Sequence, residues 1–299
     1  CARLMNFSDL LTEQVCEIRK SPLAMMAMAF PVLTQIPVVG WYAAGQFRAR
    51  CQKMIDHVEE DVKKCIDRYQ GDDDCFVHVY ISKGKKNPAL THDQLKNVCM
   101  DFFLAGMETT STTLRWGMLL MAANQDVQEK IRREIHEVIG KERFPTMADR
   151  AHMPYTTAAV HELQRVANIL PLNVQHRTVC DTKIEGHRIP EGTIVMGQIF
   201  SVLTTDPLFE KPEQFMPERF LMADGKTPNR EAVDHLIPFS IGKRQCAGEG
   251  LARMELFLGL TAILQKYSIR PPLEGKLDLS PTLGSVNLPK SNALQMIPV

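Results

Sequence analysis

Cys246 is the residue of this sequence whose neighbours most clearly favour a chemical role for its side chain. It lies between Gly242 and Gly248, follows Arg244 by two residues, and precedes a long apolar helical pattern. Glycines have no Cβ and let a flat, bulky group approach the backbone, while a helix N-terminus favours a thiolate over a thiol. An arginine at this spacing can hold a carboxylate by a charge-assisted bond. The run therefore predicts a thiolate metal ligand, with an inert buried thiol as the alternative.

A second unusual stretch covers residues 101–113. Five hydroxyl side chains run in succession from Thr109 to Thr113, three residues after Gly106. Glycine weakens a helix interior, and serine and threonine compete for its backbone hydrogen bonds. Apolar residues on both sides predict that this weak point lies inside a buried helix, which is typical of a functional site. The alternative is a structural patch whose hydroxyls bond back to the preceding turn.

A third pattern is an ion pair on one helix. Glu162 and Arg165 are three residues apart and so share a helix face. Such pairs are common on surfaces, where they contribute little, but apolar neighbours here predict at least half-burial. His176 follows this helix, and a histidine in a strand is usually an ordinary surface or core residue.

The elements that must position these residues are mostly helical. Thr91 with Gln94 three residues later has the spacing of a capping box, and it predicts a long helix to about Ala123. The other predicted elements are helices from 46 to 69, from 126 until Gly140, from about 157 to 168 and over 251–267, small strands and turns over 174–203, a proline-rich loop over 206–230, and a hairpin with turns over 271–299. The helix over 251–267 is apolar nearly all round, which predicts burial on every side. The fold class is mainly α with a minor β component.

Composition limits the possible functions. The 299 residues carry a formal net charge of zero, which gives no reason to expect nucleic acid as a partner. None of the eight cysteines forms a Cys-x-x-Cys pair, so neither a zinc site nor a disulfide framework is indicated, and reduced thiols facing the cytosol are expected. The apolar segment Leu23–Ala44 contains prolines that argue against a spanning helix. It is either a buried loop or a surface that dips into a membrane.

Taken together, the motifs resemble those of the cytochrome P-450 family. The pattern Phe239-x-x-Gly242-x-Arg244-x-Cys246-x-Gly248 matches the haem-binding signature of that family at every fixed position. Ala105-Gly106-x-Glu108-Thr109-Thr110 resembles its oxygen-activation motif, and Glu162-x-x-Arg165 resembles its Glu-x-x-Arg pair, with Arg219 in Pro217–Phe220 as the third member. Segments around Met153–Thr156 and Pro190–Thr193 look like the animal microsomal members.

The resemblance implies a set of roles. Cys246 would be the axial thiolate ligand of haem b. Ala105, Gly106, Phe239, Gly242 and Gly248 would border the haem, and Arg244 and His176 would bond its propionates. Thr109 would hydrogen-bond the bound dioxygen and Glu108 would relay protons. Glu162, Arg165 and Arg219 would fix the loop before Cys246.

The implied activity is that of a haem-thiolate monooxygenase. Such an enzyme inserts one atom of O2 into a lipophilic substrate, a fatty acid, a steroid or a foreign compound, with electrons from NADPH–cytochrome P-450 reductase and with cytochrome b5 as a further partner. Its location would be the cytosolic face of the endoplasmic reticulum membrane. Substrate would bind between Phe102–Thr109, Ile169–Val174, Leu23–Val39 and the tail near Ser285–Leu288.

The resemblance also implies what part of the family fold the chain holds. Residues 1–299 would be a partial catalytic domain, the C-terminal part of the cytochrome P-450 fold, without the membrane anchor, main sheet and early helices. Two alternatives stay open. One is a haem-thiolate isomerase or peroxygenase that needs no reductase, and the other is a non-catalytic fragment unable to hold haem.

Overall fold

In the computed structural model, the described residues are 52, 55–71, 75–282, 286–290 and 293–299. They are mainly helical with short strands, as the sequence predicts. The chain divides into two compact units, residues 1–104 and 105–299, and the boundary falls inside one continuous helix, α5 (His92–Ala123). The predictions for Leu23–Ala44 and for the start of the helix from residue 46 lie outside the described residues.

The described part of the first unit is built from helices. Residues 55–67 are helical and precede α4 (Phe76–Gly84) and the first part of α5. Its small core gathers Val58, Val62, Val77 and Leu95. The backbone N–H of Gln94 donates to Thr91 Oγ1 at 3.2 Å, so the predicted cap at the start of α5 is confirmed.

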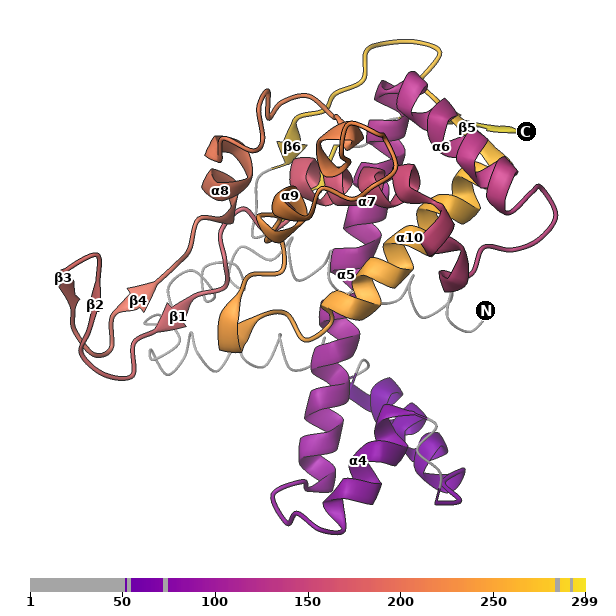
Figure 1. The fold of residues 1–299 in the computed structure, drawn as a ribbon. Helices are drawn as coiled ribbons and strands as arrows, with labels where there is room; N and C mark the ends of the chain where they lie inside the picture. The colour runs from indigo at the N-terminus through magenta and orange to yellow at the C-terminus, as the bar shows by residue number, and fades with distance from the viewer. Residues whose placement is uncertain (1–51, 53–54, 72–74, 283–285, 291–292) are drawn as a thin grey trace. The chain divides into compact units, whose positions relative to one another are not determined.

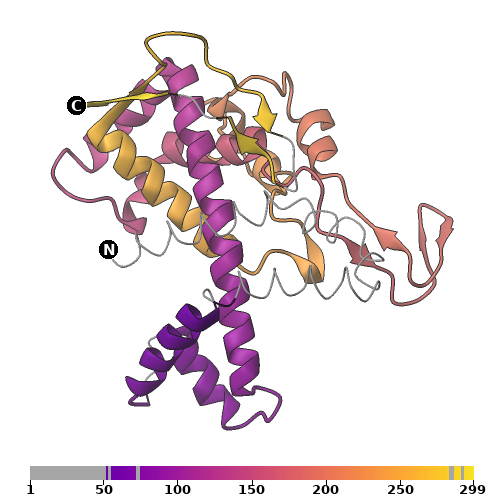
Figure 2. The ribbon, with the colours of Figure 1, turned by 180° about the vertical axis from the view of Figure 1, so that it is seen from behind.

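In the second unit, α5 packs with α6 (Gln125–Val138), α7 (Pro154–Ala167) and α10 (Glu249–Lys266) around the larger core. Two glycines allow this close approach. A Cβ at Gly117 of α5 would lie 3.1 Å from Leu163 Cδ2, and a Cβ at Gly259 of α10 would lie 3.2 Å from Leu114 Cδ2. Figures 1 and 2 both show α10 crossing the C-terminal half of α5. The crossing fixes the start of α10, and with it the end of the Cys246 loop.

A smaller core of the second unit lies under shorter elements. These are α8 (Ile199–Thr205), α9 (Arg230–Asp234) and the 3-10 helix η3 (Pro217–Phe220). Its most buried members are Leu203, Phe209, Phe220 and Ala232. Two further 3-10 helices are η2 (Met147–His152) and η4 (Gly242–Arg244).

The strands form antiparallel pairs. The pairs are β1 (His176–Arg177) with β4 (Ile194–Val195), β2 (Thr182–Ile184) with β3 (His187–Ile189), β5 (Tyr267–Arg270) with β8 (Gln295–Pro298), and β6 (Pro281–Thr282) with β7 (Leu288–Pro289). The hairpin predicted in the tail is therefore present as β6 and β7, but the last strand pairs with the chain leaving α10. That pairing is long-range, which is why the local pattern does not reveal it.

Two helix starts differ from the prediction. Helix α7 begins at Pro154, three residues before Thr157, because the Glu134 carboxylate of α6 accepts the N–H groups of Tyr155 and Thr156 at 2.9 and 2.7 Å. Helix α6 begins at Gln125, one residue before the predicted start at 126. It ends before Gly140, whose φ of +82° suits the predicted stop.

Two further segments correct the prediction. Residues 199–205 are a helix where strands and turns were expected, because Ile199 and Leu203 bury their side chains in the smaller core. Helix α10 is not buried on every side, since Leu251 and Met254 are 57% and 38% exposed near its start. None of the helices in the described ranges is both long and apolar enough to cross a membrane.

Candidate functional site

The loop that carries Cys246 connects η4 to α10 and is held by its own backbone. The N–H of Cys246 donates to the Phe239 carbonyl at 3.0 Å, and that of Gln245 donates to the Gly242 carbonyl at 3.1 Å. Gly242 has φ of +82°, a conformation that side chains with a Cβ rarely adopt. The Cys246 thiol is exposed, and a Cβ on Gly248 would lie 3.9 Å from its sulfur. The turn thus presents a thiol on a fixed backbone.

A chain of polar side chains joins this loop to α7. Gln245 Nε2 donates to the Glu249 carboxylate, which accepts Arg253 Nε at 2.8 Å. Arg253 Nη1 also donates to Gln164 Oε1 of α7 at 3.2 Å, and its guanidinium lies 5.2 Å from the ring centroid of Phe239. Sequence reasoning missed this bridge. The i, i+4 spacing of Glu249 and Arg253 was the only local signal for it.

Asn173 is a second missed contact, to the residues that precede η4 and lead into the Cys246 loop. Its Nδ2 donates to Ser240 Oγ at 2.7 Å, and its backbone N–H donates to the Gly197 carbonyl at 2.8 Å. Ser240 itself has φ of 63°, so this side-chain bond helps to hold a strained backbone. No sequence signal pointed to Asn173, because its partners lie 24 and 67 residues away.

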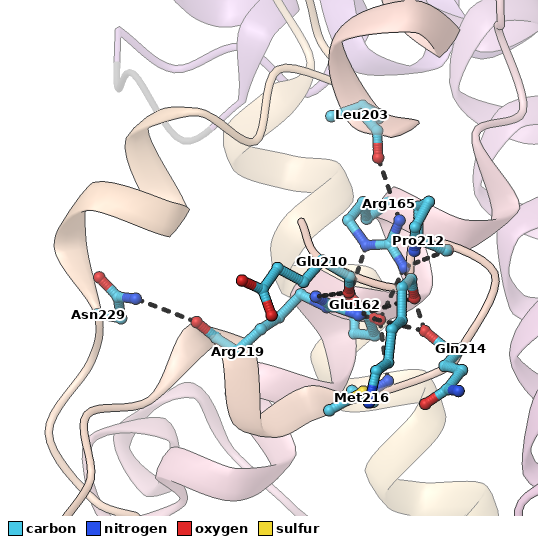
Figure 3. A network of polar contacts seen from close by, with 10 residues as sticks. Glu162, Arg165, Leu203, Glu210, Pro212, Gln214, Met216, Arg219 and Asn229 are labelled. Carbon is cyan, nitrogen blue, oxygen red and sulfur yellow. Dashed lines mark hydrogen bonds and ion pairs between the residues drawn. The ribbon is translucent and has the colours of Figure 1, made fainter. Parts of the chain in front are cut away.

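The three side chains of the predicted triad contact one another (Figure 3). Arg165 Nε lies 2.8 Å from Glu162 Oε2, and Arg219 Nε lies 3.0 Å from Glu162 Oε1. The Glu162 and Arg165 side chains are 0% and 1% exposed, and that of Arg219 is 6% exposed. The helix α7 supplies the first two, and η3 supplies the third.

The remaining bonds of the triad go to backbone. Arg165 donates to the carbonyls of Leu203, Pro212 and Gln214, and Arg219 donates to that of Glu210 at 2.9 Å. Glu162 Oε1 also accepts the Met216 N–H at 2.9 Å. These bonds satisfy the buried charges and fix the segment 203–216, which precedes the Cys246 loop in the chain.

The hydroxyl stretch of α5 differs from its prediction in two respects. Residues 105–111 are exposed or half-buried, and burial of α5 in the second unit begins only at Thr112. The helix is also regular through all its 32 residues. The reason is that burial requires partners. Leu163 of α7 and Gly259 of α10 pack closely on α5 at Gly117 and Leu114, whereas the stretch 105–111 reaches α10 through the Thr110 hydroxyl.

The hydroxyls of this stretch mostly bond back to the preceding turn. Thr109 Oγ1 donates to the Ala105 carbonyl at 2.6 Å, and Thr113 Oγ1 donates to that of Thr109 at 2.9 Å. Thr110 instead reaches α10, where its hydroxyl donates to Glu255 Oε2 at 3.1 Å. Gly106 lies on the exposed side, and among the described residues nothing would lie within 4 Å of a Cβ there. This face of α5 therefore has room for a ligand.

Two segments predicted to line a substrate region do come together. The backbone N–H of Asn287 donates to the Ile169 carbonyl at 2.8 Å, and Asn287 Nδ2 donates to the Asn168 carbonyl at 3.2 Å. Trp116 Nε1 of α5 donates to the Asn287 carbonyl at 2.9 Å. Asn287 thereby ties the tail to the chain leaving α7 and to α5.

The predicted propionate ligands lie on different elements. Arg244 is exposed at the end of η4, and His176 is half-buried in β1, opposite Val195 of β4. Their roles stay predictions.

The residues present fit a haem. An exposed single thiol is the ligand that a haem-thiolate centre requires. Within the part of the chain that the structure describes, an added Cβ at Gly242 or Gly106 would meet nothing within 4 Å, which suits the approach of a flat group near both motifs. The exposed guanidinium of Arg244 suits a carboxylate.

Comparison with known proteins agrees with this geometry. The sequence profile of the family described as Cytochrome P450 matches residues 6–296. The chain therefore belongs to the cytochrome P450 family.

Among curated proteins, the chain is similar to cytochrome P450 2C2 of Oryctolagus cuniculus, with 40% identity over 95% of the chain and 58% of that protein. It is 41% identical to cytochrome P450 2H1 of Gallus gallus over 82% of the chain and 52% of that protein. It is 40% identical to cytochrome P450 2D6 of Homo sapiens over 90% of the chain and 54% of that protein. The chain thus spans a little more than half the length of these relatives.

Proposed function

We propose that the chain is the part of a haem-dependent monooxygenase that carries the axial cysteine and the oxygen-side helix. The observation that carries this proposal is Cys246, an exposed thiol on a glycine-framed turn in a chain of the cytochrome P450 family. When bound, a haem would supply the redox chemistry that splits dioxygen, which a thiolate ligand favours.

The protein's share is to hold and orient. The backbone bond from Cys246 to Phe239 and the Gln245–Glu249–Arg253 chain fix the direction of the thiol. Arg244 and His176 would hold the two carboxylates of the cofactor. The segment 203–216, which Glu162, Arg165 and Arg219 hold by hydrogen bonds, would in turn support the loop that carries Cys246.

Thr109 would handle protons in a particular way. Its hydroxyl hydrogen is committed to the Ala105 carbonyl at 2.6 Å, so its oxygen lone pairs are what it can offer to the site. Thr109 would then accept a hydrogen bond from a water molecule, and the half-buried Glu108 beside it would exchange protons with solvent.

The substrate, by this proposal, is a lipophilic compound such as a fatty acid, a steroid or a foreign chemical. Electrons would come from NADPH through a reductase, with cytochrome b5 as a second donor, at the cytosolic face of the endoplasmic reticulum. The similarity to relatives named cytochrome P450 2C2 and 2D6 supports this proposal. Residues 1–299 would be part of one catalytic domain.

The test is the carbon monoxide difference spectrum of the reduced protein. We expect a thiolate-type band that disappears in Cys246→Ser and persists in the matched control Cys180→Ser, whose thiol is also exposed. A thiolate band in Cys246→Ser would overturn the ligand assignment. Stoichiometric haem after gel filtration of residues 1–299 would exclude a fragment unable to hold haem.

A second comparison separates the monooxygenase from an isomerase or peroxygenase. Turnover of a lipophilic substrate is measured with NADPH and reductase, and again with hydrogen peroxide alone. The proposal requires the first system to yield hydroxylated product. Product with peroxide only would favour the reductase-independent alternative.

A further inference from the structure

A cleft of about 920 Å³ lies in the second unit among α6, η2, α7 and the segment 220–228, and its lining does not include the Cys246 loop. Part of its wall is apolar, from Val138, Met147, Ala158, Phe220 and Leu221. Arg150 and His161 also line it, and both line a narrow recess that continues to Arg253. The volume and mixed wall are those of a site for a small organic molecule.

Arg150 is a half-buried cation without a counter-charge. Among the described residues, no carboxylate lies within 4.0 Å of its guanidinium and no hydrogen bond to it is formed. Burial lowers the pKa of Arg150, and the like charge of Arg253 adds to this effect. A half-buried guanidinium beside a second one is unfavourable unless an anion joins them.

His161 meets the cleft from α7, and its side chain has no polar partner in the part of the chain that the structure describes. The residue is 8% exposed, and its ring packs edge-on against Phe220 with centroids 5.4 Å apart. Burial lowers its pKa to about 3, with Arg253 and Arg150 as further causes. The imidazole is therefore neutral at physiological pH and keeps one N–H to donate.

Among the described residues, the nearby acidic groups form their hydrogen bonds and ion pairs with partners other than Arg150. Glu134 is occupied by the N–H groups of Tyr155 and Thr156 and by the Thr156 hydroxyl. Glu249 is bonded to Arg253 and Gln245. Glu137 lines the cleft but is exposed, so water screens its charge.

We propose that this cleft binds a small organic anion, a carboxylate attached to an aromatic or aliphatic body. The carboxylate would lie between the Arg150 guanidinium and the His161 ring, and the body would pack on Phe220 and Leu221. None of the residues predicted to hold haem lines this cleft, so binding there can be tested without measuring monooxygenase activity. Its occupation would relieve the unfavourable closeness of Arg150 and Arg253.

The experiment uses 4-benzoylbenzoate, an aromatic carboxylate that crosslinks on irradiation, with the intact chain. Labelled positions are mapped by mass spectrometry, and labelling is measured against probe concentration. We expect labels within residues 138–161 or 220–228. In Arg150→Gln the half-saturating concentration should rise about tenfold or more, because a charge-assisted bond is lost.

Matched variants make the result specific. Arg133→Gln removes the same charge from an exposed position of α6 that does not line the cleft, and it should leave labelling unchanged. His161→Phe keeps a ring against Phe220 but removes the donor, so it should also weaken labelling. The neutral methyl ester of the probe should label the cleft weakly and without dependence on Arg150.

Two outcomes would overturn the proposal. One is labelling of the cleft that is equal in the parent chain and in Arg150→Gln, with circular dichroism showing both folded. The other is equal labelling by the acid and its methyl ester. Because the positions are mapped directly, labelling confined to other parts of the chain counts against the site as well.

Discussion

Glu162 and Arg165 form a two-pronged ion pair within α7, with Nε to Oε2 at 2.8 Å and Nη2 to Oε1 at 2.9 Å. The two side chains are 0% and 1% exposed. The cost of removing both charges from water offsets the Coulomb attraction of such a pair. Its net effect on folding stability therefore depends on complete hydrogen bonding of both side chains. Glu162 also accepts hydrogen bonds from Arg219 and from the Met216 N–H. Arg165 donates its other hydrogen bonds to the carbonyls of Leu203, Pro212 and Gln214.

The first prediction concerns this pair. Glu162→Gln should lower the free energy of unfolding by about 3–5 kcal/mol, because two buried guanidinium groups lose their counter-charge. Urea unfolding followed by circular dichroism measures the change. As a control, Arg188→Gln removes an ion pair with Asp181 whose side chains are 71% and 53% exposed. That change should stay within about 1 kcal/mol, and an equal effect of both variants would contradict the importance of burial.

The second prediction compares two glycines near Cys246. Added Cβ atoms at Gly242 and Gly250 would both meet nothing within 4 Å, but Gly242 has φ of +82° whereas Gly250 lies in α10. Gly242→Ala should therefore destabilise the protein by roughly 1–2 kcal/mol. Gly250→Ala should stabilise it by up to about 1 kcal/mol. Thermal unfolding of both variants checks the opposite signs, and a loss in both would point to a clash instead of backbone strain.

The third prediction tests Thr109. With electrons supplied through a reductase, Thr109→Ala should reduce hydroxylated product about tenfold or more while NADPH consumption continues and peroxide accumulates. Thr109→Ser keeps a hydroxyl that can bond to Ala105 and should largely restore product. Ser111→Ala, which removes an exposed hydroxyl bonded to the Glu108 carbonyl, serves as the control. Unchanged product per NADPH in Thr109→Ala would remove Thr109 from proton delivery.

The fourth prediction is a pH dependence set by His235 and Asp206. Their Nδ1 and Oδ2 atoms are 2.7 Å apart, and this bond raises the pKa of His235 and lowers that of Asp206. Because the His235 pKa is raised, its contribution to stability is complete below the unfolded value of about 6.5 and is lost as pH rises through the folded value. Because the Asp206 pKa is lowered, the contribution of Asp206 to stability is complete above its unfolded value of about 3.9. That contribution is lost as pH falls through the folded value.

The pair therefore stabilises the protein most between about pH 4 and 6.5. Asp206→Asn should bring the pKa of His235 back toward about 6.5, as measured by proton NMR of its ring. The Asn side chain can still accept the Leu208 N–H, so the turn at residue 206 is kept. The stability difference between the two proteins should shrink from pH 5 to pH 8. A stability difference that stays constant from pH 5 to pH 8 would show that the hydrogen bond stabilises the protein and that the charges of the two groups do not.

Local patterns predicted most of the helices and the residues of the motifs. The cap at Thr91, the stop at Gly140 and the helix after Cys246 depend on residues a few positions apart, which sequence periodicity reports directly. The Glu162 and Arg165 pair was readable for the same reason, since residues three apart share a helix face. Arg219 could be assigned only by resemblance, because it lies 57 residues from Glu162 along the chain.

The sequence by itself determined the family, the mainly helical class and the identity of Cys246 as the candidate ligand, because these depend on residue type and short spacing. Only the tertiary structure decided which groups are buried and which distant groups meet. Glu134 accepts N–H groups at the start of α7, so that helix begins earlier than predicted. Asn173 donates to Ser240, and Arg253 connects the Cys246 loop to α7. The tertiary structure also leaves the hydroxyl stretch 105–111 of α5 exposed or half-buried, and it brings Arg150 and His161 into the lining of one cleft. Burial and long-range hydrogen bonds are properties of packed surfaces, so no local pattern can specify them.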